Sequence, residues 1–199
     1  MEPMPSRAAR TAYVVLTVLF WITIVAGVVL VAHRLFGLLQ DSQTLSVPAS
    51  ANVEDARLPE AYEIAGPLPV TVDVDDPTLG QRVVATVPTL VWWTLAVVVL
   101  WLLRKIARSA AEGDPFRASN ATRLRWLGAL FLVGFPLATI VEGFFTNWFF
   151  AGIHLPPGGI TIAFPVVSGP AIMAAVCLFA LAEVFAYGAR LREDVDATI

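Results

Sequence analysis

Charged side chains are scarce in this chain. Asp, Glu, Lys and Arg make up 15% of the 199 residues, whereas hydrophobic residues make up 57%. In an ordinary soluble domain, about a quarter of all residues are charged. So few charges cannot cover a globular surface of this size with polar groups. The composition therefore excludes an ordinary water-soluble domain and predicts that a lipid bilayer is the solvent.

Residues that build disulfides, metal sites and catalytic centres are also few. The one cysteine, Cys177, allows no disulfide within the chain. His33 and His154 lie far apart and lack the spacing of two metal ligands on one helix. A G-x-S-x-G nucleophile motif and a glycine-rich phosphate-binding loop are both missing. We therefore expect no cofactor, no metal site and no enzymatic activity.

Four long stretches are nearly free of charge. Residues 11–32 and 83–103 contain none, and residues 126–150 contain only Glu142. The uncharged residues 143–182 are divided by a turn-forming His-Leu-Pro-Pro-Gly-Gly segment. About 20 helical residues cross the roughly 30 Å of hydrocarbon, where backbone amides must bond within their own segment. The sequence therefore predicts one all-α membrane domain with four transmembrane helices. They are expected at residues 11–36, 83–112, 119–150 and 168–192.

The basic residues are concentrated in three segments. Ten of the 13 Lys and Arg residues lie in the N-terminal tail, in residues 104–125 and in the C-terminal tail. Four crossings place these segments on one side of the membrane, and Lys and Arg favour the cytoplasmic side. We expect both termini and the hairpin turn 113–118 in the cytoplasm. The loops 37–82 and 151–167 are then external.

The first external loop contains the pattern of a β-strand. Apolar and other residues alternate over residues 68–75, the period of a half-buried strand. Residues 160–164, in the second external loop, have a similar pattern. We expect these two segments to pair as a small external β element. The alternative is an irregular acidic loop, because residues 34–82 hold eight acids against three arginines.

Two motifs resemble a known family. The first consists of Gly113-Asp114-Pro115-Phe116, Asn120, Arg123-Leu124-Arg125 and Gly128. The second is the C-terminal sequence EVFAYGARLREDVDATI, residues 183–199. Together they resemble the G-x-P-F…N…R-L-R…G signature and the acidic ending of the DUF2975 family of bacterial membrane proteins. Asp114 stands where a basic residue is common in that family, and Ala197 stands in place of a leucine.

The resemblance implies a four-helix protein of the bacterial inner membrane, without a known reaction. Members are often encoded beside a small helix-turn-helix regulator, which suggests a role in membrane-linked transcriptional control. We therefore predict a partner-docking surface on the hairpin and no direct binding of nucleic acid. Its predicted residues are Arg108, Arg117, Asn120, Arg123 and Arg125. The alternatives are that these charges only set the topology, or that they hold anionic lipid head groups.

Two carboxylates lie within the apolar helices. A carboxylate in hydrocarbon is costly and usually faces a partner or water. Glu142 is expected near the outer end of the third helix, bonded to neighbouring polar groups. Glu183 is expected near the inner end of the fourth helix. Its expected partners are Arg190, Arg104 or Lys105. The functional alternative for either carboxylate is a ligand or proton site.

The function that the sequence favours is a non-enzymatic sensor or docking protein. In this hypothesis the external loops sense a condition or ligand and the hairpin contacts a cytoplasmic regulator, with Glu183 and Arg190 tying the last helix to it. A small transporter or immunity-type protein that uses Glu142 is the first alternative. A structural subunit of a membrane complex is the second, because small residues in the fourth helix permit close packing. The ligand and the oligomeric state are left open.

The predicted topology has a direct test. Reporter fusions at residue 60 and at residue 115 should report opposite compartments, because one crossing separates the two positions. Reports from the same compartment would contradict the four-helix topology. Recovery of the protein in the supernatant after ultracentrifugation without detergent would contradict the membrane assignment itself.

Overall fold

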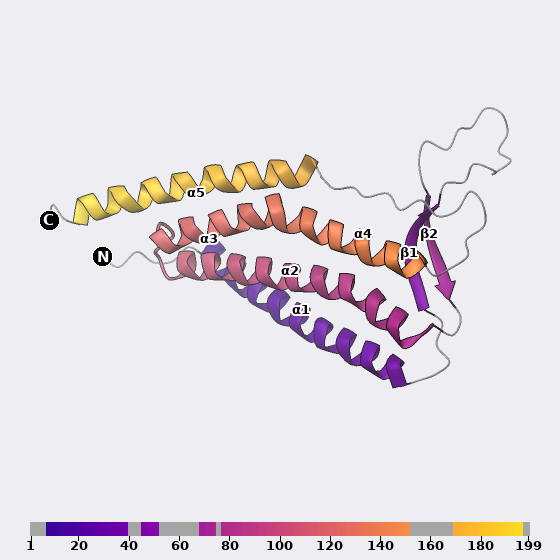
Figure 1. Ribbon diagram of the computed structural model, residues 1–199. Helices are drawn as coiled ribbons and strands as arrows, with labels where there is room; N and C mark the ends of the chain where they lie inside the picture. The colour runs from indigo at the N-terminus through magenta and orange to yellow at the C-terminus, as the bar shows by residue number, and fades with distance from the viewer. Residues whose placement is uncertain (1–6, 40–44, 52–67, 75–76, 152–168, 197–199) are drawn as a thin grey trace, which may run out of the picture. The chain divides into compact units, whose positions relative to one another are not determined.

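The computed structural model of the chain describes residues 7–39, 45–51, 68–74, 77–151 and 169–196 (Figure 1). Its helices are α1 (Arg7–Leu39), α2 (Leu79–Ala111), α3 (Ala118–Ala129), η1 (Leu130–Gly134), α4 (Phe135–Ala151) and α5 (Gly169–Asp196). The segments α3, η1 and α4 follow one another without a break. The described residues thus contain four helical stretches long and apolar enough to cross a membrane. The predicted four helices are confirmed.

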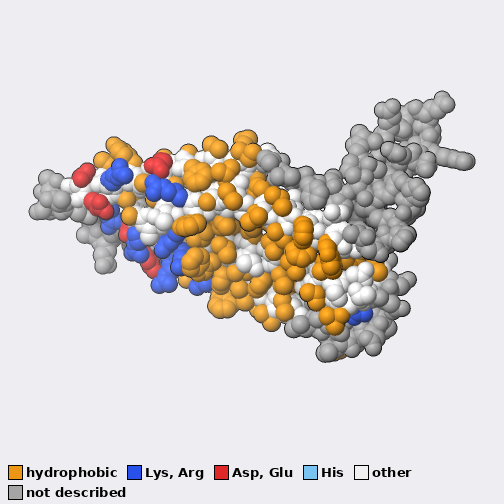
Figure 2. Space-filling view, viewed as in Figure 1, with side chains coloured by type: hydrophobic (Ala, Val, Ile, Leu, Met, Phe, Trp, Pro, Cys, Tyr) orange, Lys and Arg blue, Asp and Glu red, His pale blue; other side chains and the backbone are white. Residues whose placement is uncertain are grey.

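The helices expose their apolar side chains. Val29 of α1 is 61% exposed and Met173 of α5 is 69% exposed, and both are typical of many others. Figure 2 shows hydrophobic side chains covering much of the helical surface, with charged side chains gathered mainly at one end. A water-soluble protein rarely exposes so large a contiguous apolar surface. These faces are suited to lipid acyl chains.

The chain divides into two compact units. One comprises residues 1–29, 92–137 and 167–199, and is called the hairpin unit below. The other comprises residues 30–91 and 138–166, and is called the loop unit. In the hairpin unit, the first turns of α1, the turn between α2 and α3, and the last turns of α5 lie at the same end (Figure 1).

The hairpin unit has a small core between α2, α3 and α5. Leu102, Leu124, Leu127 and Ala182 are buried there together. Residues with little or no side chain let α3 and α5 approach closely, which is the usual way to pack helices in lipid. A Cβ atom added at Gly128 would lie 3.0 Å from the Phe179 ring. This contact packs α5 closely against α3 within the chain.

Helix α1 is joined to α2 by one tryptophan. The indole Nε1 of Trp93 donates a hydrogen bond of 2.9 Å to the carbonyl oxygen of Thr23. The same indole lies against Gly27, where an added Cβ atom would come within 1.9 Å of the ring. Only glycine leaves room for this contact, which anchors two apolar helices through a polar group.

The third predicted helix contains a π-helical segment. In η1 the backbone N–H of Phe135 donates to the carbonyl of Leu130, five residues earlier. The next residue, Pro136, has no N–H, and its ring would crowd the carbonyl of Leu132 in a regular α-helix. The wider π turn moves that carbonyl away, a common local solution within long helices.

The loop unit contains the start of α2 and a two-stranded sheet. The hydroxyl of Thr78 accepts a hydrogen bond from the Gln81 N–H, while Gln81 Oε1 accepts one from the Thr78 N–H. This reciprocal capping box starts α2 one turn earlier than expected. Strands β1 (Leu45–Ala51) and β2 (Leu68–Val74) pair antiparallel, with Val47 opposite Val72.

The strand at residues 68–74 has a partner that the sequence analysis did not name. Residues 68–74 form the strand that their alternation predicts, and among the described residues they pair with β1. Segment 160–164 lies outside the described residues. A local physical reason favours β1, because it belongs to the same loop and a shorter connection closes with less loss of chain entropy.

The contact between Trp93 and Gly27 generates a stability prediction. Gly27→Ala should lower the free energy of unfolding in detergent by about 1–3 kcal/mol, because the added methyl group overlaps the indole. Thermal unfolding followed by circular dichroism measures the change. Gly169→Ala is the matched control, since no atom lies within 4 Å of the added Cβ there. Equal stability of the two variants would contradict the close approach of α1 and α2.

Candidate functional site

The turn between α2 and α3 begins with a Schellman motif, which ends α2. Gly113 has a φ of 85°, in the left-handed region that favours glycine. The Asp114 N–H donates to the Ser109 carbonyl (3.1 Å), and the Gly113 N–H donates to the Ala110 carbonyl (3.2 Å). These two bonds satisfy carbonyls that a helix end otherwise leaves open. Helix α2 therefore ends just before Gly113, where the sequence predicted a turn.

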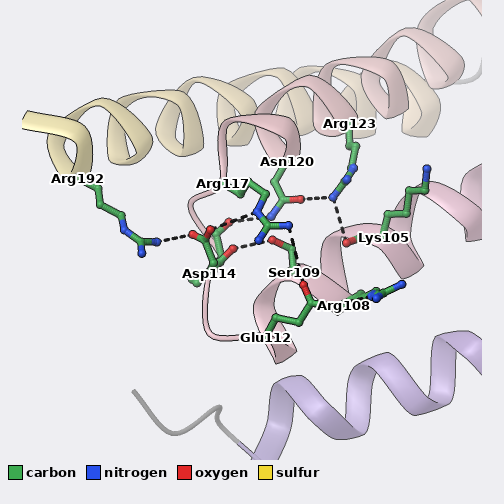
Figure 3. A network of polar contacts seen from close by, with 10 residues as sticks. Lys105, Arg108, Ser109, Glu112, Asp114, Arg117, Asn120, Arg123 and Arg192 are labelled. Carbon is green, nitrogen blue, oxygen red and sulfur yellow. Dashed lines mark hydrogen bonds and ion pairs between the residues drawn. The ribbon is translucent and has the colours of Figure 1, made fainter. Parts of the chain in front are cut away.

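Buried polar side chains hold this turn from inside. The Ser109 hydroxyl donates to the Asp114 carbonyl (2.6 Å) and is 2% exposed. The Asn120 amide nitrogen donates to the Pro115 carbonyl (2.9 Å), and Asn120 is 0% exposed. Figure 3 shows both side chains directed into the turn. Because buried polar groups need their bonds, the turn has little freedom to change shape.

Arg123 extends this set of bonds to α2. Its guanidinium donates to the Asn120 side-chain oxygen (2.7 Å) and to the Lys105 carbonyl oxygen (3.2 Å) (Figure 3). The residue is half-buried. Arg123 therefore links the last turns of α2 to the first turns of α3, and its charge is directed toward the interior of the hairpin.

The turn is also attached to the end of α5. Asp114 forms an ion pair with Arg192 (Figure 3) and a second one with Arg117, at 3.2 Å. The Phe116 ring lies 5.3 Å from the Phe185 ring, centroid to centroid. A Cβ atom added at Gly188 would lie only 2.6 Å from Phe116. An aromatic contact and an ion pair thus fasten the turn to the last helix.

Arg108 and Arg117 lie on the surface of the hairpin, and their carboxylate partner belongs to the hairpin as well. The Arg108 side chain is 63% exposed and pairs with Glu112 at 2.8 Å. The Arg117 side chain is 50% exposed and lies 3.9 Å from the same carboxylate. Exposed pairs of this kind contribute about 0–1 kcal/mol each. They are therefore easily exchanged for pairs with another molecule.

Glu183 has a partner that the sequence reasoning did not foresee. Its carboxylate accepts a hydrogen bond of 2.8 Å from Arg125 on α3, not from Arg190, Arg104 or Lys105. The two residues face each other across α3 and α5, whereas Arg190 lies two turns along the same helix as Glu183. Arg190 itself is exposed on α5. Glu142 lies half-buried in α4, within the loop unit.

The predicted docking residues therefore have different environments. Arg108 and Arg117 are exposed, Arg125 binds α5, and Asn120 and Arg123 are bonded inside the hairpin. Residue type and spacing did not single out the residues that close the turn and attach it to α5. They are Ser109, Asp114, Phe116, Gly188 and Arg192. One signal was present, because the two family motifs contain four of these five residues and meet each other in the structure.

Four long apolar helical stretches and a charged hairpin at their ends define a multi-pass membrane protein. A family model described as protein of unknown function, DUF2975, matches residues 49–199. Because the match covers more than half of the chain, the chain belongs to this family, as the two motifs predicted. Comparisons with curated proteins and with solved structures found no match.

The buried asparagine generates the prediction for this site. Asn120→Ala should lower the free energy of unfolding by about 1–3 kcal/mol, because the Pro115 carbonyl and Arg123 both lose a partner away from water. Chemical unfolding in detergent measures this loss. Asn147→Ala, at an exposed position of α4, should change it by less than about 0.5 kcal/mol. If both variants were equally stable, Asn120 would not hold the turn.

Proposed function

We propose that this chain is a non-enzymatic protein of the bacterial inner membrane that acts by contact. Both termini and the hairpin face the cytoplasm, and the hairpin docks a cytoplasmic regulator. One observation carries this proposal. The turn is held by bonds among buried groups, while Arg108 and Arg117 stand half or more exposed on it.

The distribution of charge supports the cytoplasmic orientation. The start of α1, the hairpin and the end of α5 lie at one end of the hairpin unit (Figure 1), and ten of the 13 basic residues belong to these segments. Lys and Arg close to transmembrane ends are retained on the cytoplasmic side. The same end carries the exposed acidic and basic side chains that Figure 2 shows together.

Because the turn is fastened to α5, it is better suited to docking a partner than a flexible loop would be. A partner that binds a preformed surface does not have to order it, so less of the binding free energy is lost. The exposed pairs of Glu112 with Arg108 and Arg117 are weak enough to be replaced by a partner's carboxylates. The docking surface in this proposal comprises Arg108 and Arg117. Asn120 and Arg123 support it from inside.

The partner is a small helix-turn-helix regulator encoded beside the gene. This part of the proposal comes from the family resemblance, since members are often found next to such a regulator. In the proposal the chain holds the regulator at the membrane and itself binds no nucleic acid. In the proposal the external loops, which contain β1 and β2, receive the signal that changes the contact with the regulator.

The docking surface is tested by co-purification. We expect the adjacently encoded regulator, co-expressed with the tagged chain, to be retained through detergent extraction. Arg108→Gln combined with Arg117→Gln should reduce the retained regulator about tenfold or more, because two interface arginines contribute about 1 kcal/mol or more each. Quantitative immunoblotting of the eluted complex measures the ratio.

A matched control separates the docking surface from charge in general. Arg7→Gln combined with Arg10→Gln removes two exposed charges from the start of α1, at the same end of the hairpin unit. This variant should retain the regulator as the wild type does. If the wild type retains none, or if both double variants lose it equally, the docking proposal is wrong.

A further inference from the structure

Two cations mark the boundary between the apolar and polar parts of α2. Residues 83–103 carry no charge, and Arg104 and Lys105 follow directly. An uncharged helical run of 21 residues has a length of about 31 Å, which matches the hydrocarbon thickness of a bilayer. The two cations therefore stand where lipid phosphates are found. The docking arginine Arg108 lies one turn farther from the hydrocarbon.

The other basic residues of the hairpin have a carboxylate partner or, for Arg123, two neutral oxygen atoms of the chain. Arg108 and Arg117 pair with Glu112, and Arg125 pairs with Glu183. Across the residues that the structure describes, neither Arg104 nor Lys105 forms an ion pair with a carboxylate. Both are half-buried. A half-buried cation without an anion is unfavourable, since buried charges are normally paired.

The two cations contact aromatic rings instead. The Lys105 ammonium lies 3.6 Å from the centre of the Trp101 ring. The Arg104 guanidinium lies 5.2 Å from the centre of the Phe20 ring on α1. The Tyr13 phenol of α1 lies beside the same guanidinium. A ring attracts a cation by about 0.5–2 kcal/mol but does not neutralise it. The positive charge thus remains available to an anion.

We propose that Arg104 and Lys105 bind the head-group phosphate of an anionic phospholipid. The cations supply charge and N–H donors, and the Tyr13 hydroxyl supplies one more donor near Arg104. The Trp101 ring, 43% exposed, lies on the hydrocarbon side, where it suits the upper part of an acyl chain. Basic residues between transmembrane helices are a known means of holding such head groups. This proposal does not depend on the docking of a regulator.

The experiment compares two bilayers. Native mass spectrometry of the protein from nanodiscs of phosphatidylglycerol, and from nanodiscs of phosphatidylcholine, counts the lipid that each form retains. The wild type should bind phosphatidylglycerol more tightly than phosphatidylcholine. Arg104→Gln combined with Lys105→Gln should weaken that binding about thirtyfold, because each cation near the surface contributes about fivefold. Arg108→Gln combined with Arg117→Gln removes the same charge from paired positions and should change the binding less than about threefold.

A charge-conserving variant controls for folding. Arg104→Lys combined with Lys105→Arg keeps both charges and should bind phosphatidylglycerol within about threefold of the wild type. If the glutamine variant does not fold, this swap and the lipid preference of the wild type decide the question. The proposal is overturned if the wild type binds both lipids equally or if the swap abolishes binding. It is also overturned if a folded glutamine variant binds like the wild type.

Discussion

Hydrocarbon cannot hydrogen-bond to a peptide group, and most of this structure follows from that constraint. Each apolar stretch must satisfy its own backbone, so the valine-rich α1 and α2 are helical in spite of the modest helix propensity of valine. Some polar groups in the apolar helices bond to backbone carbonyls. The indole of Trp93 does so with the carbonyl of Thr23, and Pro136 is accommodated by a π turn.

The polar residues of the hairpin form a local framework. The turn closes on Gly113, and Ser109 and Asn120 fill it with bonded polar groups. Phe116 and Asp114 then attach it to α5. Two sequence motifs that lie more than 50 residues apart are thus one structural unit. This contact gives a physical reason for the occurrence of both motifs in one chain.

The basic residues of this unit do not act alike. Arg123 is bonded to interior oxygens and so stabilises the fold, whereas Arg125 pairs with the exposed Glu183 across α3 and α5. Arg108 and Arg117 are exposed and weakly paired, which suits contact with another molecule. Arg104 and Lys105 meet aromatic rings at the edge of the apolar span, which suits a lipid phosphate. These three groups of basic residues differ in their bonding partners and in their distance from the apolar span, not in residue type.

The sequence by itself determined the four apolar helices, the turn at Gly113 and the family, because length, charge and glycine chemistry are local properties. It did not determine which side chains meet. Glu183 bonds to Arg125 and not to a neighbour on its own helix, and residues 68–74 pair with β1. Asn120 matched a docking motif in sequence but is buried. Only tertiary structure decides such contacts, since they depend on which segments distant in the sequence come together in space.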